Sequence, residues 1–252
     1  MKAQVVPARC QFPIVLLHGL FGFVERRLGA VRFTYFRGVA PYLESVGNRV
    51  VAIPVPSCGR IEDRARKIAH ALDTHPDLKD LPVNVIAHSM GGLDGRYLIS
   101  RLGYGDRVRS LTTIVTPHRG SYLANGLIIP GLGRAFKWLI PALQDLNEKA
   151  LVRFNEETPD RPGTRYFSIP AKTGFIPCTP FLWPTYLFLL AVRGANDGQV
   201  PLDSAKWGEV LEEARADHIQ LIGLRLGLNA WTCENHLDLY GRITMRLFGS
   251  GF

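Results

Sequence analysis

Residues 85–92 read V-I-A-H-S-M-G-G, an apolar run followed by a serine and two glycines. This order is typical of the nucleophile elbow, the strand-to-helix turn that lifts a reactive serine above a parallel sheet. The usual pattern is G-x-S-x-G, but the residue two before Ser89 is Ala87. The turn requires small residues where its arms meet, and alanine exceeds glycine by only one methyl group. The stretch therefore favours a nucleophile over a serine that only shapes a tight turn.

The segments around this turn alternate between short apolar runs and helical patterns. Unbroken apolar runs, typical of strands buried on both faces of a parallel sheet, occur at 14–17, 50–55, 83–87 and 111–115. Helical spacing occurs at 61–72, where the stripe is Ile61, Ala65, Ile68, Ala69 and Leu72, and again at 92–102. Strands that alternate with helices predict βαβ units. We expect one α/β domain over residues 1–252, with a mostly parallel sheet flanked by helices.

The composition of the 252-residue chain is that of an ordinary globular protein, with 46% hydrophobic and 21% charged residues. Its net charge is +8 and its pI is about 9.5, yet the basic residues form no run of five or more. This scatter favours solvated faces first and an anionic interface such as a phospholipid surface second. No nucleic-acid-binding motif accompanies the charge, so we expect no nucleic-acid partner.

The four cysteines form no CxxC pair, and their spacing fits neither a zinc site nor a compact disulfide framework. An even number permits one or two disulfides without implying them. The residues after Met1 contain no apolar segment of a signal peptide, which predicts an intracellular protein. If Met1 was added to a mature secreted form, that prediction does not hold.

Two apolar segments interrupt the α/β pattern. In 122–162, helical spacing fits equally a core helix and a mobile lid over a cleft; the residues are Leu132, Phe136, Leu139, Ile140, Leu143 and Leu146. The segment 175–192 contains three prolines, which exclude a regular membrane-spanning helix of about 20 residues. We expect a helical lid or cap insertion at about 122–162 and an irregular apolar cleft segment, buried or facing lipid, at about 175–192.

A nucleophilic serine needs a base within hydrogen-bond reach and an acid that orients that base. Four of the seven histidines are expected to support loops or to be solvated: His18, His70, His75 and His118. A fifth, His88, is next to Ser89, and the sharp turn should direct the two side chains apart. His218 is the favoured base, and His236 is the weaker candidate because its segment has a helical pattern. Asp197 is the favoured acid, in a turn after the run 186–192, which we expect to be a strand. Asp217 is the rival acid, but adjacent residues rarely orient each other's rings.

Acyl transfer also requires two N–H groups that stabilise an oxyanion. Met90 supplies the N–H that follows the nucleophile. The H-G-L-F-G turn at 18–22 offers the N–H of Leu20 as the second donor. The candidates Ser89, Asp197 and His218 then follow the chain order of α/β hydrolases.

Four segments resemble the family I bacterial true lipases, triacylglycerol lipases of the α/β-hydrolase superfamily. They are P-I-V-L-L-H-G-L-F-G at 13–22, A-H-S-M-G-G-L-D-G-R-Y at 87–97, L-T-T-I-V-T-P-H-R-G-S at 111–121 and N-D-G-Q-V-P-L-D-S-A-K-W-G at 196–208. The resemblance implies the α/β-hydrolase fold and hydrolysis of carboxylic esters through an acyl-enzyme. It also implies Ser89 as nucleophile, Asp197 as acid and His218 as base, with the N–H groups of Leu20 and Met90 as oxyanion hole.

The chain departs from this family at its metal site and its disulfide. Larger members bind calcium through an Asp two residues after the catalytic His, where this chain has Gln220. The region near Phe175 offers no second Asp, so we expect no metal and no other cofactor. The family disulfide has a Cys shortly after the catalytic Asp, where this chain has Leu202, Asp203 and Ser204.

The resemblance and the apolar segments together predict a triacylglycerol lipase that acts on acylglycerols or other lipid esters at a lipid interface. No stable protein partner is implied. One alternative is a phospholipase or acyltransferase, which the basic surface would suit. The other is a non-catalytic lipid-binding protein with a hydrolase fold, which is disfavoured because every predicted site residue is present.

Overall fold

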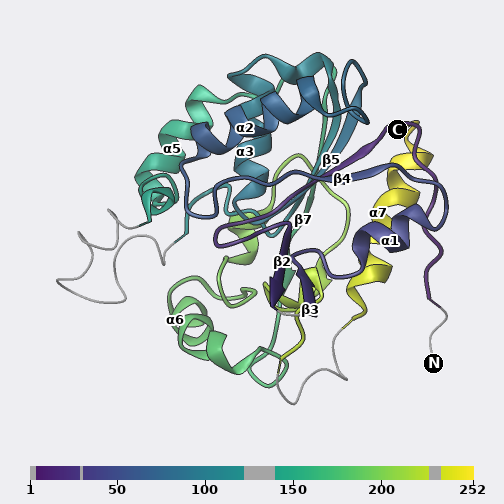
Figure 1. Ribbon diagram of the computed structural model, residues 1–252. Coiled ribbons are helices and arrows are strands. Elements are labelled where there is room, and N and C mark those ends of the chain that lie inside the picture. Colours follow the sequence, from purple (N-terminus) through teal and green to yellow (C-terminus); the bar gives the residue numbers. More distant parts are fainter. Residues whose placement is uncertain (1–3, 29–30, 122–139, 227–233) are drawn as a thin grey trace.

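A computed structural model describes residues 4–28, 31–121, 140–226 and 234–252 (Figure 1). Its main sheet has six strands, and every neighbouring pair is parallel. In spatial order they are β4 (Val50–Ala52), β1 (Ile14–Leu17), β5 (Val83–His88), β6 (Val108–Ile114), β7 (Arg165–Ile169) and β9 (Glu209–Val210). Two small sheets pair β2 (Glu25–Leu28) with β3 (Val31–Thr34), and β8 (Ala171–Lys172) with β10 (Ala214–Arg215).

Helices cover both faces of the main sheet (Figure 1). One layer holds α2 (Ile61–Thr74), α3 (Gly91–Ser100) and α5 (Glu148–Glu157), and the opposite layer holds α1 (Val39–Glu44) and α7 (His236–Gly249). Helix α6 (Trp183–Arg193) lies outside these layers, at the lower left of the view. The predicted architecture of a mostly parallel sheet between helices is therefore confirmed.

The alternation of side chains along the central strands separates the core into two layers. On β1, Ile14 and Leu16 pack toward α1 and α7, whereas Val15 and Leu17 pack toward α2 and α3. All four side chains are fully buried. A strand covered on both faces has no polar face, which explains why this strand reads as an unbroken apolar run.

Two of the predicted strands differ from the structure. The run 50–55 contributes only Val50–Ala52 to the sheet, because Pro54 has no N–H to continue the ladder. The run 186–192, predicted as a strand before the acid, is part of α6. Pro184 lies in the first turn of that helix, where proline is tolerated, and Tyr186 and Leu189 are buried three residues apart.

The segment predicted as a lid is described only in its second half, since 122–139 lies outside the described residues. Within 140–162 the chain forms a short 3-10 helix, Pro141–Gln144, followed by α5. Of the predicted stripe, Leu146 is buried in a cluster with Leu93 of α3, and Ile140 and Leu143 pack against this cluster. At these positions the helical pattern reflects core packing, and the lid stays a prediction for the rest.

Cys10, Cys58 and Cys178 are free thiols, and Cys233 lies outside the described residues. No helix in the described part of the chain is both long and apolar enough to span a membrane.

Candidate active site

The turn at Ser89 has the geometry of a nucleophile elbow. It joins β5 to α3, and Ser89 has a φ of 55°, a conformation that strains a non-glycine residue. The N–H of Ser89 donates to the carbonyl of Ile114 (2.8 Å), and the hydroxyl of Thr116 donates to the carbonyl of Ser89 (2.6 Å). Neighbouring strand β6 and the loop after it therefore hold the strained residue in place.

Close backbone approach explains the small residues around this turn. A Cβ on Gly91 would lie 2.7 Å from the carbonyl oxygen of Leu17, and one on Gly19 would lie 2.8 Å from Cβ of Ser89. Ala87 is fully buried in β5 and packs in the core between the sheet and α2. The methyl group that departs from the G-x-S-x-G pattern thus occupies core space and leaves the turn unobstructed.

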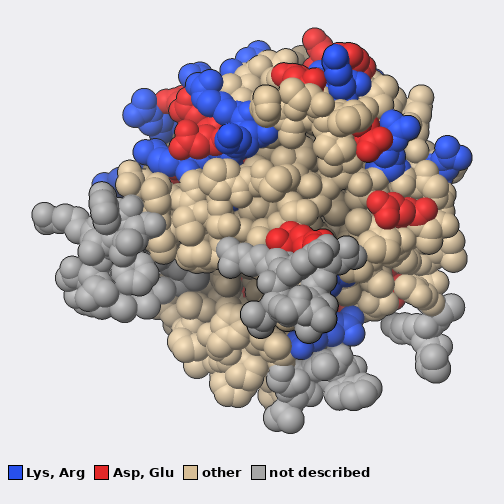
Figure 2. Space-filling view, viewed as in Figure 1, with Lys and Arg blue, Asp and Glu red and all other residues tan. Residues whose placement is uncertain are grey.

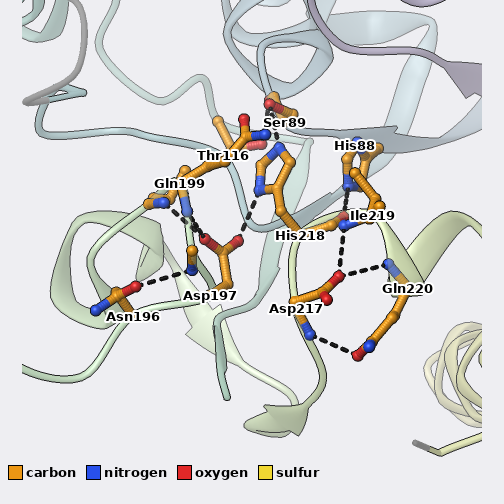
Figure 3. A network of polar contacts seen from close by, with 12 residues as sticks. His88, Ser89, Thr116, Asn196, Asp197, Gln199, Asp217, His218, Ile219 and Gln220 are labelled. Carbon is orange, nitrogen blue, oxygen red and sulfur yellow. Dashed lines mark hydrogen bonds and ion pairs between the residues drawn. The ribbon is translucent and has the colours of Figure 1, made fainter. Parts of the chain in front are cut away.

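Ser89, His218 and Asp197 form one hydrogen-bonded chain (Figure 3). His218 Nε2 lies 3.0 Å from Ser89 Oγ, and His218 Nδ1 lies 2.7 Å from Asp197 Oδ2. A carboxylate only accepts hydrogen bonds, so Nδ1 carries the ring proton and Nε2 accepts from the serine hydroxyl. Asp197 is fully buried and His218 is 5% exposed, which leaves water little access to the pair.

The loop after α6 fixes the carboxylate of Asp197. Its Oδ1 accepts from the N–H groups of Gln199 (2.8 Å) and Val200 (2.6 Å), which leaves Oδ2 for the ring of His218. The N–H of His218 donates to the carbonyl of Asp197 (2.9 Å), so the two loops are also joined through their backbones. A helix, rather than the predicted strand, leads to this turn.

The rival candidates have other partners. Asp217 Oδ2 accepts from the N–H and the hydroxyl of Thr179, at 2.7 and 2.6 Å. Its Oδ1 accepts from the N–H groups of Ile219 and Gln220. Burial raises the pKa of Asp217, and these hydrogen bonds oppose that rise. Asp217 therefore shapes the loop around His218 and makes no contact with its ring among the described hydrogen bonds.

His236, the weaker base candidate, lies at the start of α7, and its Nε2 donates to the carbonyl of Arg37 (2.6 Å). Burial lowers its pKa. The structure does not bring it to Ser89.

The turn with Leu20 lies beside the elbow, as a second oxyanion donor requires. Within the described part of the chain, neither the N–H of Leu20 nor that of Met90 donates to a protein group. The turn is shaped by a Gly22 N–H to Gly19 carbonyl hydrogen bond (3.2 Å) and by Phe21, whose φ is 57°. Both N–H groups are therefore without a protein acceptor in the described part of the chain, as the predicted oxyanion role requires.

Arg64 on α2 supports this turn and was not anticipated. Its guanidinium donates to the carbonyls of His18 (2.6 Å) and Pro56 (2.8 Å), and it pairs with Asp94 (2.8 Å). Both charged side chains are fully buried, and burial raises the pKa of Asp94 to about 7 despite the arginine. A sequence signal existed, since Arg64 falls within the buried apolar stripe of α2, three residues after Ile61.

Three histidines near the sheet are buried in the neutral form. Burial lowers the pKa of His18 to about 4, and it lowers those of His88 and His118 well below the usual 6.5. His18 Nδ1 donates to the carbonyl of Gly19 (2.9 Å), so its Nε2 is the acceptor for the N–H of Val55. These rings support the loops around the site, as predicted for His18 and His118.

Acid is expected to destabilise the fold through these rings. Because their folded-state pKa values lie below the unfolded value, the unfolded chain binds more protons, and stability is lost as the pH falls below about 6.5. Below that pH, each ring lowers the free energy of unfolding by about 1.4 kcal/mol per pH unit. In denaturant unfolding between pH 4 and 7, the free energy of unfolding of His118→Gln should depend less steeply on pH than that of the wild type. The difference in slope should correspond to about one proton. The exposed His70→Gln is the control, and an unchanged slope in His118→Gln would contradict the assignment.

The residues around Gln220 do not fit the calcium site that the family implies. Gln220 Nε2 donates to the carbonyl of Pro177 (2.9 Å), and its Oε1 accepts from the N–H of Asp217 (2.9 Å). Both polar atoms of the side chain thus serve protein groups, as do both oxygens of Asp217. Among the described residues, no group of three or more His, Cys, Asp or Glu could hold a metal ion.

Comparison with known proteins shows the family and the fold of the chain. Residues 14–234 match the model described as "Alpha/beta hydrolase family". The chain is 35% identical over 206 residues to triacylglycerol lipase 2 of Saccharomyces cerevisiae, covering 75% of this chain and 62% of the yeast protein. It therefore spans less than two thirds of that relative's length. It is 27% identical over 286 residues to a triacylglycerol lipase of Vibrio cholerae, covering 96% and 89% of the two chains.

Among solved structures, a metagenomic carboxyl esterase has the same fold, with a TM-score of 0.82. The two share 18% sequence identity, and the superposition covers 99% of this chain and 79% of the esterase. The comparisons confirm the fold and the likeness to lipases that were predicted from the sequence.

Proposed function

The chain belongs to the alpha/beta hydrolase family, with relatives of the lipase and esterase type, and we propose that it is a serine hydrolase that cleaves acylglycerol esters at a lipid surface. The hydrogen-bonded chain from Ser89 through His218 to Asp197 carries the proposal. It provides a nucleophile, a base with the correct free nitrogen and an acid that holds that tautomer.

The proposed reaction has two halves. Ser89 Oγ attacks the ester carbonyl while His218 Nε2 accepts its proton, and the N–H groups of Leu20 and Met90 stabilise the oxyanion. His218 then gives the proton to the departing alcohol, which leaves the acyl group on Ser89. Water, deprotonated by His218, attacks this acyl-enzyme, and His218 returns that proton to Ser89 Oγ as the bond to the acyl group breaks and the fatty acid leaves. Asp197 stays ionised and stabilises the imidazolium that forms in each half.

Helix α6 supports a lipid surface as the site of action. Its sequence is largely apolar, and among the described residues its buried side chains are Tyr186 and Leu189. Tyr186 packs with Leu182 and with Ile219, the residue after the proposed base. The outer side exposes Leu187, Leu190 and Val192, and the exposed apolar residues that precede the helix are Phe175, Ile176 and Phe181. Charged side chains gather over the upper part of the molecule, and the surface over α6 carries few of them (Figure 2). Contiguous exposed apolar surface of this kind marks an interaction site, and lipid fits its lack of charge.

We propose further that the reaction needs no metal and no other cofactor. The hydrogen bonds of Gln220 and Asp217 support this, because they join the loop of His218 to 177–179 through protein groups.

The substrate class can be tested with soluble p-nitrophenyl butyrate and emulsified long-chain triacylglycerol. We expect turnover of both, undiminished by excess EDTA, and a rate on triacylglycerol that rises above its solubility limit. Leu187→Glu should lower the ratio of the emulsion rate to the soluble-ester rate about thirtyfold, because burial of one leucine in lipid contributes about 2 kcal/mol. Phe248→Glu, at an exposed position on α7, is the matched control and should leave the ratio unchanged.

The same assays separate the alternatives. Faster hydrolysis of phosphatidylcholine vesicles than of triacylglycerol would favour a phospholipase. Equal ratios in Leu187→Glu and Phe248→Glu would contradict the lipid surface on α6. Binding of vesicles without turnover of any ester would favour a non-catalytic lipid-binding protein.

A further inference from the structure

A series of hydrogen bonds joins the turn that carries Leu20 to the loop that carries His218. The N–H of Gly19 donates to Tyr35 Oη (3.2 Å), and Tyr35 Oη lies 2.9 Å from His88 Nδ1. On the other side of the ring, His88 Nε2 lies 2.9 Å from the carbonyl oxygen of His218 (Figure 3). Four segments that are distant in the sequence are therefore connected from one half of the site to the other.

The partners fix the direction of each hydrogen bond. A carbonyl oxygen only accepts, so His88 Nε2 carries the proton and donates to His218. Burial, reinforced by the neighbouring His218, lowers the pKa of His88 well below its usual value, and the neutral ring leaves Nδ1 as an acceptor. Burial also raises the pKa of Tyr35, so its hydroxyl keeps the proton that it donates. All three bonds run from Gly19 to His218, and bonds aligned in this way polarise and strengthen one another.

Ring packing holds both side chains in this position. The rings of Tyr35 and Phe36 meet edge to face with centroids 5.1 Å apart, and those of Tyr35 and His88 do so at 5.7 Å. The His88 and His218 rings are also edge to face, at 4.8 Å. A Cβ on Gly19 would lie 3.0 Å from Tyr35 Oη, so the turn rests directly on the hydroxyl. Backbone atoms form both ends of the series, which suits a role in position rather than in proton transfer.

We propose that Tyr35 and His88 are positioning residues that couple the oxyanion turn to the loop of the catalytic base. The proposal rests on the proposed ester-hydrolase function. Tyr35 holds the N–H of Gly19, so that the next N–H, that of Leu20, stays directed at the oxyanion. His88 holds the carbonyl of His218, so that the imidazole of His218 stays within hydrogen-bond distance of Ser89 Oγ. A displacement of about 1 Å at such groups costs roughly a hundredfold in rate.

The test compares Tyr35→Phe, His88→Asn and the double variant. Asparagine keeps an acceptor near the position of Nδ1 but lacks the donor that reaches His218. Rates on p-nitrophenyl butyrate are expressed per active site, titrated by the burst of a p-nitrophenyl phosphonate, so that unfolded protein does not count. We expect kcat to fall roughly ten- to hundredfold in each single variant, with KM changed by less than about twofold. The kcat of the double variant should lie within about threefold of the lower kcat of the two single variants, because both changes break the same series of hydrogen bonds.

A transition-state analogue provides the readout that a merely structural role would not change. In both single variants, Ki for a trifluoromethyl ketone, which forms an oxyanion on the serine, should rise by the factor by which kcat falls. Ki for the matching methyl ketone should stay the same. Tyr42→Phe is the matched control, because this tyrosine on α1 donates its hydroxyl hydrogen bond to the carbonyl of Val5 instead. It should keep the wild-type kcat.

Three outcomes would overturn the proposal. An unchanged kcat in Tyr35→Phe would reject the coupling while leaving the ester-hydrolase function intact. Losses that multiply in the double variant would show two independent contacts rather than one series. A wild-type protein that turns over no ester would reject the hydrolase function and, with it, the positioning role.

Discussion

Ser89→Ala is expected to lower kcat on p-nitrophenyl butyrate by at least about four orders of magnitude, because it removes the hydroxyl that attacks the ester in the proposed reaction. In the structure, Ser89 Oγ is the group that lies within 3.0 Å of His218 Nε2. Alanine fits the elbow, where only a short side chain is needed. The folded state should therefore persist, and its thermal midpoint should stay near that of the wild type.

The matched control is Ser100→Ala, at the end of the same helix, α3. Ser100 is 5% exposed, and its hydroxyl has no hydrogen-bond partner among the described residues. Its removal should leave kcat unchanged. If Ser89→Ala kept a rate comparable with that of Ser100→Ala, the acyl-enzyme mechanism would be wrong.

Asp197→Asn should lower kcat by about four orders of magnitude, with little change in the fold. The amide would offer an N–H or a neutral oxygen to His218 Nδ1 in place of the carboxylate oxygen at 2.7 Å. The ring would then lose the tautomer that leaves Nε2 free, and its imidazolium would lose the buried counter-charge. Rates per titrated active site, measured from pH 6 to 9, would show the loss at every pH.

Asp217→Asn also tests the choice of Asp197 as the acid, because it changes the rival carboxylate. This carboxylate accepts hydrogen bonds from Thr179, Ile219 and Gln220, so its loss should lower the thermal midpoint by loosening the loop. The rate of the folded enzyme should fall far less than in Asp197→Asn. An equal fall in the two variants would contradict the choice of Asp197 as the acid.

Local pattern was sufficient for the central fold. The runs around 14–17 and 83–87 are strands that helices cover on both faces. Because both faces are buried, the sequence of each strand is continuously apolar and can be recognised. The elbow was equally readable, because its small residues and its flanking strand and helix are adjacent in the chain. The run 186–192 was misread, since a helix that is apolar all round and a buried strand look alike over seven residues.

The supporting contacts could not be predicted, because they join segments far apart in the sequence. Arg64 reaches the carbonyl of His18, and Tyr35 reaches His88, across 46 and 53 residues. Which polar group meets which buried partner depends on the packed fold, and no spacing rule carries that information. Asp197 was chosen as the acid from chain order, and the structure places it next to the His218 ring although the element before it was predicted wrongly.

We propose Ser89, activated by His218 and Asp197, as the nucleophile of this hydrolase. The most direct measurement is incubation with a p-nitrophenyl alkylphosphonate, followed by mass spectrometry of the digested protein. We expect one adduct per chain, on Ser89, with activity lost in proportion to labelling. Labelling of Asp197→Asn should be far slower. An adduct on another residue, or full loss of activity without an adduct on Ser89, would contradict this proposal.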